Sequence, residues 1–266
     1  MKGIVIIPTY NEAKNISSIV ERVFESAPDV YVMVVDDSSP DGTAQVVKEL
    51  SAKNSHVGLL LRKNKEGLGR AYLHAFSKVI EDPSFEYLVM MDADHSHDPQ
   101  YLRPMVAKLL GGSDVVIGSR YCRGGGMEGW EFWRRALSVC ANMYCRLVTG
   151  LPVNDTTAGY NMIRTDALRK VALASLDMSG YAFQIELKYT LWRSGARVVE
   201  VPIIFHRRRE GESKLSSHII REGILAPWKM LLKRSPVPSA QKSREHTYGK
   251  KESIESHGAP SAGRSL

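Results

Sequence analysis

The segment that decides the fold of this chain spans residues 87–94 and reads Tyr87-Leu88-Val89-Met90-Met91-Asp92-Ala93-Asp94. Its first five residues are apolar or aromatic, which is typical of a strand buried on both faces of a parallel sheet. Two carboxylates follow, and ligands of open α/β sheets bind outside the carboxyl ends of the strands. Because divalent cations such as Mg²⁺ prefer oxygen ligands, Asp92 and Asp94 are predicted to hold one. A solvated turn is the alternative.

The sequence around this segment alternates between strand and helix patterns. The predicted strands are residues 3–8, 30–35, 57–61, 87–91, 114–118 and 198–205. The predicted helices are residues 11–26, 43–53, 69–80, 130–148 and 216–234, the last interrupted at Pro227. Pro202 favours an edge or a bulge for the final strand, and residues 122–129 are predicted to form a mobile loop. The alternation predicts an α/β fold with a mostly parallel central sheet and helices on both faces.

Composition indicates an ordinary globular protein. The chain has 266 residues, of which 43% are hydrophobic and 24% charged. We expect one domain over residues 1–234 and a disordered, Ser-, Pro- and Gly-rich tail over 235–266. The three cysteines form neither a disulfide framework nor a metal-binding pair, and neither a signal peptide nor a spanning apolar run is expected. These features predict a cytoplasmic location.

The positive charge of the chain is concentrated near its C-terminal end. The formal net charge is +7, and residues 193–234 contain ten Lys or Arg against four Glu. A solvated surface explains such a cluster, and so does a polyanionic partner such as nucleotide phosphates or an anionic membrane. No motif that reads RNA or DNA is present, so nucleic acid is not expected as a partner.

Three predicted strands end in side chains that suit nucleotide binding. Residues 3–8 precede Tyr10 and Glu12, residues 30–35 precede Asp37, and residues 87–91 precede the carboxylate pair. An aromatic ring can stack on a base, and carboxylates can accept hydrogen bonds from base or ribose. Each cluster alone is explained by turn or capping roles. Because the ends of parallel strands meet at one edge of a sheet, the three together predict a nucleotide diphosphate with its metal.

Further motifs extend this pattern along the chain. They lie at residues 8–12, 35–43, 67–71, 91–99, 118–121, 129–142, 155–160, 181–186, 200–203 and 211–214. Together they resemble the inverting family 2 glycosyltransferases with the GT-A fold, a Rossmann-like α/β fold, and the similarity runs from about residue 3 to 220. Arg208 followed by Gly211-Glu212-Ser213-Lys214 is more specific. It resembles the branch of polyprenol-phosphate (dolichol-phosphate) mannose synthases.

The resemblance implies roles for residues at matching positions. A guanosine pocket would be lined by Pro8, Tyr10, Glu12, Val35 and Asp37. The diphosphate and its Mg²⁺ or Mn²⁺ would be met by Asp92, Ala93 and Asp94, with Ser96 where some relatives have Gln as a third metal ligand. Donor phosphates would be bound by Arg120, Arg208 and Lys214, although Arg207-Arg208-Arg209 replaces the usual acidic residue before the arginine. The acceptor phosphate would be held by Arg134 and Ser138.

The implied reaction moves mannose from GDP-mannose to a polyprenyl (dolichyl-type) phosphate with inversion. Asp155 and Glu186 are the candidates for a general base. A phosphate acceptor removes the need for one, because a phosphate monoester is largely a dianion at neutral pH. A glucosyltransferase that uses UDP-glucose and a non-catalytic module that binds polyanions are the alternatives.

A lipid acceptor also implies a peripheral position on the cytoplasmic face of a membrane, and the resemblance allows a small membrane-protein partner. Trp130, Phe132 and Trp133 lie beside Arg134 and Arg135, as in an interfacial segment. Within residues 216–234 the apolar positions form a stripe, comprising Ile220, Ile224, Trp228, Leu231 and Leu232. The alternative for both segments is a core helix, because an apolar stripe serves either role.

Overall fold

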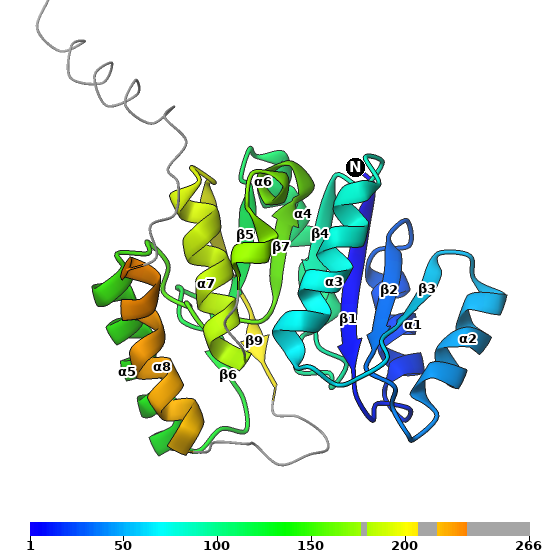
Figure 1. The fold of residues 1–266 in the computed structure, drawn as a ribbon, viewed down its shortest axis with the longest axis horizontal. Helices are drawn as coiled ribbons and strands as arrows, with labels where there is room; N and C mark the ends of the chain where they lie inside the picture. The colour runs from blue at the N-terminus through cyan, green and yellow to red at the C-terminus, as the bar shows by residue number, and fades with distance from the viewer. Residues whose placement is uncertain (177–179, 207–216, 233–266) are drawn as a thin grey trace, which may run out of the picture. The chain divides into compact units, whose positions relative to one another are not determined.

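The computed structural model describes residues 1–176, 180–206 and 217–232 (Figure 1). Seven strands form one sheet in the order β3-β2-β1-β4-β7-β5-β8. In chain order they are β1 (Gly3–Thr9), β2 (Tyr31–Asp36), β3 (Val57–Leu61), β4 (Tyr87–Met90), β5 (Val115–Ser119), β7 (Asn161–Arg164) and β8 (Val198–Pro202). All neighbouring pairs are parallel except the two made by β7. A second sheet pairs β6 (Gly126–Met127) with β9 (Ile204–Phe205).

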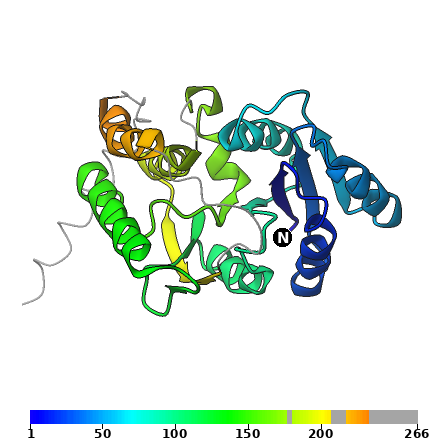
Figure 2. The same cartoon turned by 90° about the horizontal axis from the view of Figure 1, so that it is seen from below.

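Helices cover both faces of the large sheet. One face packs on α1 (Ile16–Ser26), α2 (Thr43–Lys53) and α4 (Leu102–Leu110). The opposite face packs on α3 (Leu68–Glu81), α6 (Thr165–Arg169) and α7 (Gly180–Arg193). Two further helices, α5 (Phe132–Thr149) and α8 (Ser217–Leu232), pack together beside α7 (Figures 1 and 2). Short 3₁₀ turns occupy Pro99–Tyr101 and Leu173–Ser175.

Alternation along the strands explains the two cores. In β1, Val5 and Ile7 enter one core and Ile4 and Ile6 enter the other, and all four are buried. Successive side chains of a strand point to opposite faces, so a sheet covered on both faces needs apolar residues at every position. The predicted α/β fold with a mostly parallel sheet and helices on both faces is therefore confirmed.

Several predicted boundaries were wrong. The strand predicted at 198–205 is split into β8 and β9, although Pro202 does end an edge strand. The helix predicted from residue 11 begins at Ile16, because Asn11 has a left-handed backbone. The predicted interruption at Pro227 is absent, and α8 continues through it, since the neighbouring Ala226 and Met230 are buried against α7. Residues 122–129 are not wholly loop, because they contain β6.

Candidate active site

Three neighbouring strands end at the same edge of the sheet. β1 lies between β2 and β4 and runs parallel to both, with Thr9 opposite Asp36 and Ile6 opposite Met90. The loops that follow these strands therefore start side by side. This convergence is what the sequence predicted, and it brings together the segments that carry Tyr10, Asp37 and the Asp92–Asp94 pair.

Each of these loops contains a residue with a left-handed backbone. Asn11, Ser38 and His95 have φ values of 63°, 53° and 63°, and they are the only residues other than glycine with positive φ in the described part of the chain. Such a conformation is unfavourable for a residue with a Cβ, so the surroundings must hold it. The N–H of Asn11 donates to Oγ of Ser39 at 3.0 Å, and Oγ of Ser38 donates to the carbonyl of Arg62 at 2.6 Å. The loops after β1 and β2 therefore brace each other, and the β2 loop is also tied to the residue after β3, whereas His95 contacts Ser18 and Arg22 of α1.

Asp36 joins the ends of β1 and β2. Its Oδ1 accepts from Oγ1 of Thr9 at 2.9 Å and from Oγ of Ser39 at 2.6 Å, and its side chain is fully buried. Of the two adjacent carboxylates, Asp36 thus has a structural role. This leaves the predicted ligand-binding role to Asp37.

The predicted base-stacking residue, Tyr10, presents an accessible ring. Its side chain is 39% exposed, and Nζ of Lys65 lies 3.5 Å from its ring centroid. Arg62, three residues before Lys65, forms a salt bridge through Nη1 with Oδ1 of Asp37 at 2.6 Å. Burial raises the pKa of Asp37, and the Arg62 guanidinium opposes that shift. Arg62 was missed by sequence reasoning, although it directly follows β3 and so obeys the same strand-end rule.

The other residues predicted for the guanosine pocket lie at the same strand ends. Pro8 and Val35 are paired across β1 and β2, and the side chain of Val35 is fully buried, so only its main chain can meet a ligand. Oε2 of Glu12 accepts from Nδ2 of Asn15 at 2.8 Å. The contacts of all these residues with a nucleotide stay predictions.

The Asp92–Asp94 loop is ordered by its own hydrogen bonds. Oδ1 of Asp94 accepts from the N–H of Ser96 at 3.0 Å and from its Oγ at 2.6 Å. The N–H of Asp92 donates to Nδ1 of His97 at 3.0 Å, and the same nitrogen lies 3.8 Å from Oδ2 of Asp92. His97 in turn stacks on the ring of Tyr160, with centroids 5.0 Å apart. These contacts fix the two carboxylates at the end of β4.

The donor atoms of this loop fit a hard divalent cation. Within the described residues no three His, Cys, Asp or Glu side chains group together as a metal site. Two carboxylates with the Ser96 hydroxyl supply oxygen donors alone, as Mg²⁺ and Mn²⁺ prefer, and such cations commonly take their other ligands from substrate phosphates and water. Asp92, Asp94 and Ser96 therefore suit a metal that binds together with a diphosphate.

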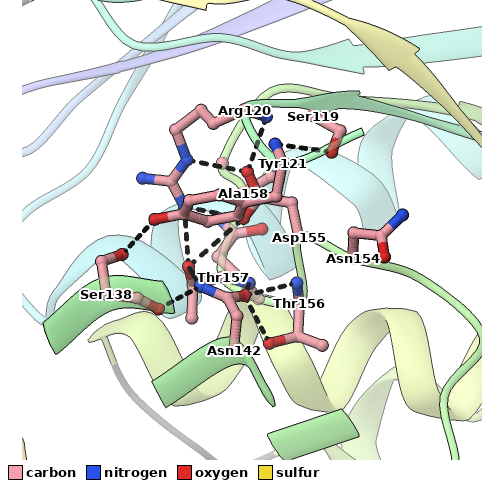
Figure 3. Close-up of polar contacts among 12 residues, drawn as sticks. Ser119, Arg120, Tyr121, Ser138, Asn142, Asn154, Asp155, Thr156, Thr157 and Ala158 are labelled. Atoms are coloured by element: carbon pink, nitrogen blue, oxygen red, sulfur yellow. Dashed lines mark hydrogen bonds and ion pairs between the residues drawn. The ribbon is translucent and has the colours of Figure 1, made fainter. Parts of the chain in front are cut away.

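A second polar group surrounds Arg120, which follows β5 (Figure 3). Its Nε and Nη2 donate to the two carboxylate oxygens of Asp155 at 2.7 Å each, and Nη2 also donates to Oγ1 of Thr157 at 2.7 Å. Burial alone would raise the pKa of Asp155, but the Arg120 guanidinium outweighs it, so the pKa lies below its ordinary value. The predicted phosphate-binding arginine is thus held in a buried bidentate ion pair.

Helix α5 is tied to this group through two side chains (Figure 3). Oδ1 of Asn142 accepts from both the N–H and Oγ1 of Thr156, at 2.7 and 2.8 Å. Oγ of Ser138 accepts from the hydroxyl of Tyr121 at 2.6 Å. The structure therefore brings Ser138, one of the two residues predicted for the acceptor phosphate, next to the neighbour of Arg120. The other, Arg134, lies one turn earlier on α5 and pairs with Glu131 at 3.1 Å.

Two contacts connect the Arg120 group to the Asp92–Asp94 loop. The ring of Phe205 lies between them, with its centroid 5.7 Å from that of His97 and 5.5 Å from Cζ of Arg120. A Cβ added to Gly159 would lie 3.2 Å from Cε1 of His97 and 3.9 Å from Oδ2 of Asp92. The predicted metal residues and the predicted phosphate residue are therefore parts of one region.

Of the two candidate general bases, Asp155 does not suit that role, whereas Glu186 stays a prediction. Both carboxylate oxygens of Asp155 accept hydrogen bonds from Arg120, and its lowered pKa makes it a weak base. Glu186 is buried within α7. Arg208 and Lys214, the remaining predicted donor-binding residues, lie outside the described residues, as does the tail predicted at 235–266.

Apolar side chains lie exposed along α5 and α8. On α5 only Asn142, Cys145 and Thr149 are buried, whereas its exposed stripe comprises Phe132, Val139, Met143 and Leu147. Among the side chains of α8 that the structure describes, residues 223–232, the exposed apolar ones are Ile224, Leu225, Trp228, Leu231 and Leu232, and Ile220 of the predicted stripe lies outside them. The two helices are joined by Tyr144, whose hydroxyl donates to the carbonyl of Ile224 and accepts from Nε1 of Trp228. Among the described residues, no helix combines the length and apolarity needed to cross a bilayer.

Comparison with known sequences decides the family. Residues 4–172 match the profile of glycosyl transferase family 2. The chain belongs to this family. It is 43% identical over 230 residues to the polyprenol monophosphomannose synthase of Mycolicibacterium smegmatis. The matched residues cover 85% of this chain and 86% of that protein. It is 40% identical over 225 residues to the undecaprenyl-phosphate mannosyltransferase of Micrococcus luteus. That match covers 85% of this chain and 92% of that protein.

Solved structures agree with the fold of this family 2 glycosyltransferase. Glucosyl-3-phosphoglycerate synthase from Mycobacterium tuberculosis, solved with Mn²⁺, UDP-glucose and phosphoglyceric acid, superposes with a TM-score of 0.63 at 17% identity, over 90% of this chain and 81% of that chain. A mannosyltransferase from Pyrobaculum calidifontis, solved with GDP-Man and Mn²⁺, superposes with a TM-score of 0.57 at 18% sequence identity. The match covers 89% of this chain and 65% of that chain. The GT-A prediction and the prediction of an enzyme are confirmed, and the non-catalytic alternative is set aside.

Proposed function

We propose that this glycosyltransferase transfers mannose from GDP-mannose to a polyprenyl phosphate and forms polyprenyl phosphate mannose with inversion. The observation that carries the proposal is the 43% identity to a polyprenol monophosphomannose synthase over most of both chains. The site geometry supports it, because carboxylates, an accessible aromatic ring and a buried arginine meet at one edge of the sheet. A glucosyltransferase using UDP-glucose is the rival within the same family.

On the donor side, the ends of β1 and β2 would bind the guanosine. The ring of Tyr10 offers a face for the base, and Asp37, held by Arg62, offers carboxylate oxygens to its N–H groups. Asp92, Asp94 and Ser96 would hold Mg²⁺ or Mn²⁺, which would neutralise charge on the departing diphosphate. Arg120, Arg208 and Lys214 are proposed to bind donor phosphates, with Arg120 fixed in direction by Asp155.

On the acceptor side, the lipid phosphate would attack the anomeric carbon itself. A phosphate monoester has a second pKa of about 6 and is mostly a dianion at neutral pH, so no side chain has to remove a proton. This agrees with a buried, fully hydrogen-bonded Asp155. What the chain must supply near two anions is positive charge, for which Arg134 on α5 is proposed, and a hydrogen-bond donor, for which Ser138 on α5 is proposed.

The exposed stripes of α5 and α8 suit a membrane surface, where the lipid acceptor would be found. An interfacial helix buries its apolar face at the boundary between headgroups and acyl chains and presents basic residues to anionic lipids. Arg134 and Arg135 lie on α5 beside the exposed Phe132 and Trp133. A peripheral position on the cytoplasmic face is therefore proposed, and a small membrane-protein partner stays a prediction.

A donor panel tests the proposed reaction. The full chain is incubated with polyprenyl phosphate, Mn²⁺ and one donor at a time: GDP-mannose, UDP-glucose or UDP-N-acetylglucosamine. Mannosyl lipid from GDP-mannose at a rate at least tenfold above the other donors is the expected result. Glucosyl lipid from UDP-glucose would favour the rival. A parallel incubation replaces the lipid by phosphoglyceric acid, and transfer to that acid but not to the lipid phosphate would refute the proposed acceptor.

A further inference from the structure

Lys188 on α7 is a buried cation with no role in the reaction as described so far. Its side chain is only 1% exposed. Nζ donates to three main-chain carbonyls, those of Ala158 at 2.7 Å, Thr156 at 2.9 Å and Gln184 at 3.3 Å. An ammonium group has three hydrogens to donate and accepts none. The three carbonyls therefore accept all three hydrogens of the charged ammonium. Without these bonds, burying the charge would be costly.

Two of these carbonyls belong to the segment that links both parts of the candidate active site. Residues 155–160 contain Asp155, which holds Arg120, and Gly159, which lies against His97 and Asp92. Figure 3 shows Thr156 and Ala158 next to the Arg120–Asp155 pair. The main chain of this segment therefore sets the position of the arginine relative to the predicted metal residues.

We propose that Lys188 is a positioning residue for glycosyl transfer, whose ammonium fixes the main chain of residues 156–158 and through it the Arg120–Asp155 pair. The proposal rests on the proposed function for its kinetic consequences. Removing the ammonium takes the Lys188 bond from the carbonyl of Thr156 and leaves the carbonyl of Ala158 with only the bond from Nδ2 of Asn161. A displacement of about 1 Å near reacting groups can cost about 100-fold in rate, so a change at Lys188 is expected to reach catalysis without touching the substrate.

The hydrogen bonds of Lys188 depend on its protonation state and therefore on pH. Burial lowers its pKa from the ordinary 10.5 to about 7, Asp155 and Glu200 oppose the shift, and Arg120 adds to it. A neutral amine has only two hydrogens to donate, so one of the three carbonyls loses its bond as the pH rises through about 7. The contribution of Lys188 to positioning is therefore nearly full at pH 6 and declines as the pH rises through about 7.

The test compares Lys188→Met with a matched control on the same helix, Leu191→Ala, which alters a fully buried apolar residue of the core. Two quantities are measured for each: kcat/KM for mannose transfer between pH 6 and 9, and amide hydrogen exchange of residues 155–160 at pH 6 without substrates. Lys188→Arg keeps the charge and several donors, and serves as the second variant if Lys188→Met fails to fold.

We expect Lys188→Met to lower kcat/KM by about 10- to 100-fold at pH 6 and to speed exchange in residues 155–160 beyond the effect of Leu191→Ala. The ratio of wild-type to variant activity should shrink toward pH 9, and Lys188→Arg should recover part of the loss. Equal exchange in the two variants, or a wild-type kcat/KM in Lys188→Met, would overturn the proposal. If the wild type transferred no mannose, the proposed function would fail, and the exchange data alone would still decide the role of Lys188.

Discussion

Arg120 and Asp155 are joined by two hydrogen bonds of 2.7 Å, one from Nε and one from Nη2, and the Asp155 side chain is fully buried. The planar guanidinium and the carboxylate match each other in this geometry. The direction of the Arg120 side chain is therefore set by a residue 35 positions further along the chain, and Arg120 is held in place for the phosphate that it is proposed to bind.

This pair predicts a large stability loss when one partner is removed. Asp155→Ala leaves the Arg120 charge buried without its partner, which typically costs about 3–5 kcal/mol. Urea unfolding at pH 7 measures the change in the free energy of unfolding. The control is Asp166→Ala, which removes an exposed partner of Arg169 and should change that free energy by less than about 1 kcal/mol. Similar losses in the two variants would contradict the buried pair.

The same pair predicts a pH dependence. Burial alone would raise the pKa of Asp155, but Arg120 holds it below the ordinary value of 3.8. A carboxyl group whose pKa is lower in the folded than in the unfolded protein adds stability above the unfolded value, and that stability is lost as the pH falls through the folded value. The stability difference between wild type and Asp155→Asn should therefore be nearly constant between about pH 5 and 6, where Lys188 is still mostly charged, and should narrow below about pH 4. A difference that widened in acid would have the wrong sign.

Gly159→Ala should impair activity more than stability. The added Cβ would lie 3.2 Å from Cε1 of His97. The imidazole of His97, which accepts a hydrogen bond from the N–H of Asp92, therefore has to shift. We expect kcat to fall roughly tenfold or more, since small displacements at a site cost rate steeply. Gly58→Ala in β3 is the control, because the nearest atom to its Cβ would be 4.0 Å away. Wild-type kcat in Gly159→Ala would show that this contact does not position the Asp92 loop.

Ser96→Ala tests whether the hydroxyl of Ser96 contributes to the proposed metal site. Both the N–H and the hydroxyl of Ser96 donate to Oδ1 of Asp94, and the variant keeps only the first bond. Loss of a group that orients a metal ligand typically costs 10- to 100-fold in metal affinity or activity. The Mn²⁺ concentration that gives half-maximal transfer should rise by about that factor, whereas Ser51→Ala on α2, remote from the candidate site, should leave it unchanged. An unchanged Mn²⁺ requirement in Ser96→Ala would remove Ser96 from the proposed metal site.

The exposed stripe of α5 predicts binding to anionic vesicles. Phe132 and Leu147 are 86% and 78% exposed, so Phe132→Asp with Leu147→Asp should preserve folding and reduce flotation with anionic liposomes severalfold. Leu110→Asp on α4 alters another exposed apolar residue and should float like the wild type. Equal flotation of the double variant and wild type would argue against α5 as the membrane contact.

Local patterns were sufficient to predict which strand ends share the edge of the sheet where the candidate site lies. Continuous apolar runs identified β1, β2 and β4, and the acidic or aromatic residues after them had to share an edge once the strands were parallel. Arg62 follows β3 in the same way and was overlooked. The antiparallel β7 between β4 and β5 was not predicted either, because four residues carry too little pattern to reveal their direction.

Pairings between distant segments could not be predicted from the sequence. Nothing local to Asp155 indicates that Arg120 is its partner, since the contact depends on how residues 155–160 cross the end of β5. Lys188 lies between Leu187 and Tyr189 on α7, and its ammonium is held mainly by carbonyls from another segment. Strand ends therefore indicate where a site lies, whereas the groups that orient it become visible only in three dimensions.

The most direct test of the account is mannose transfer to polyprenyl phosphate by the wild type and by Asp94→Asn. Both proteins, shown to be folded by thermal unfolding, are incubated with GDP-mannose and Mn²⁺, and mannose in the organic phase is measured. We predict mannosyl lipid from the wild type and a rate at least about 100-fold lower from Asp94→Asn, because the variant removes a charged oxygen from the proposed metal site. Mannosyl lipid formed equally fast by both proteins, or no mannosyl lipid from the wild type, would contradict the account.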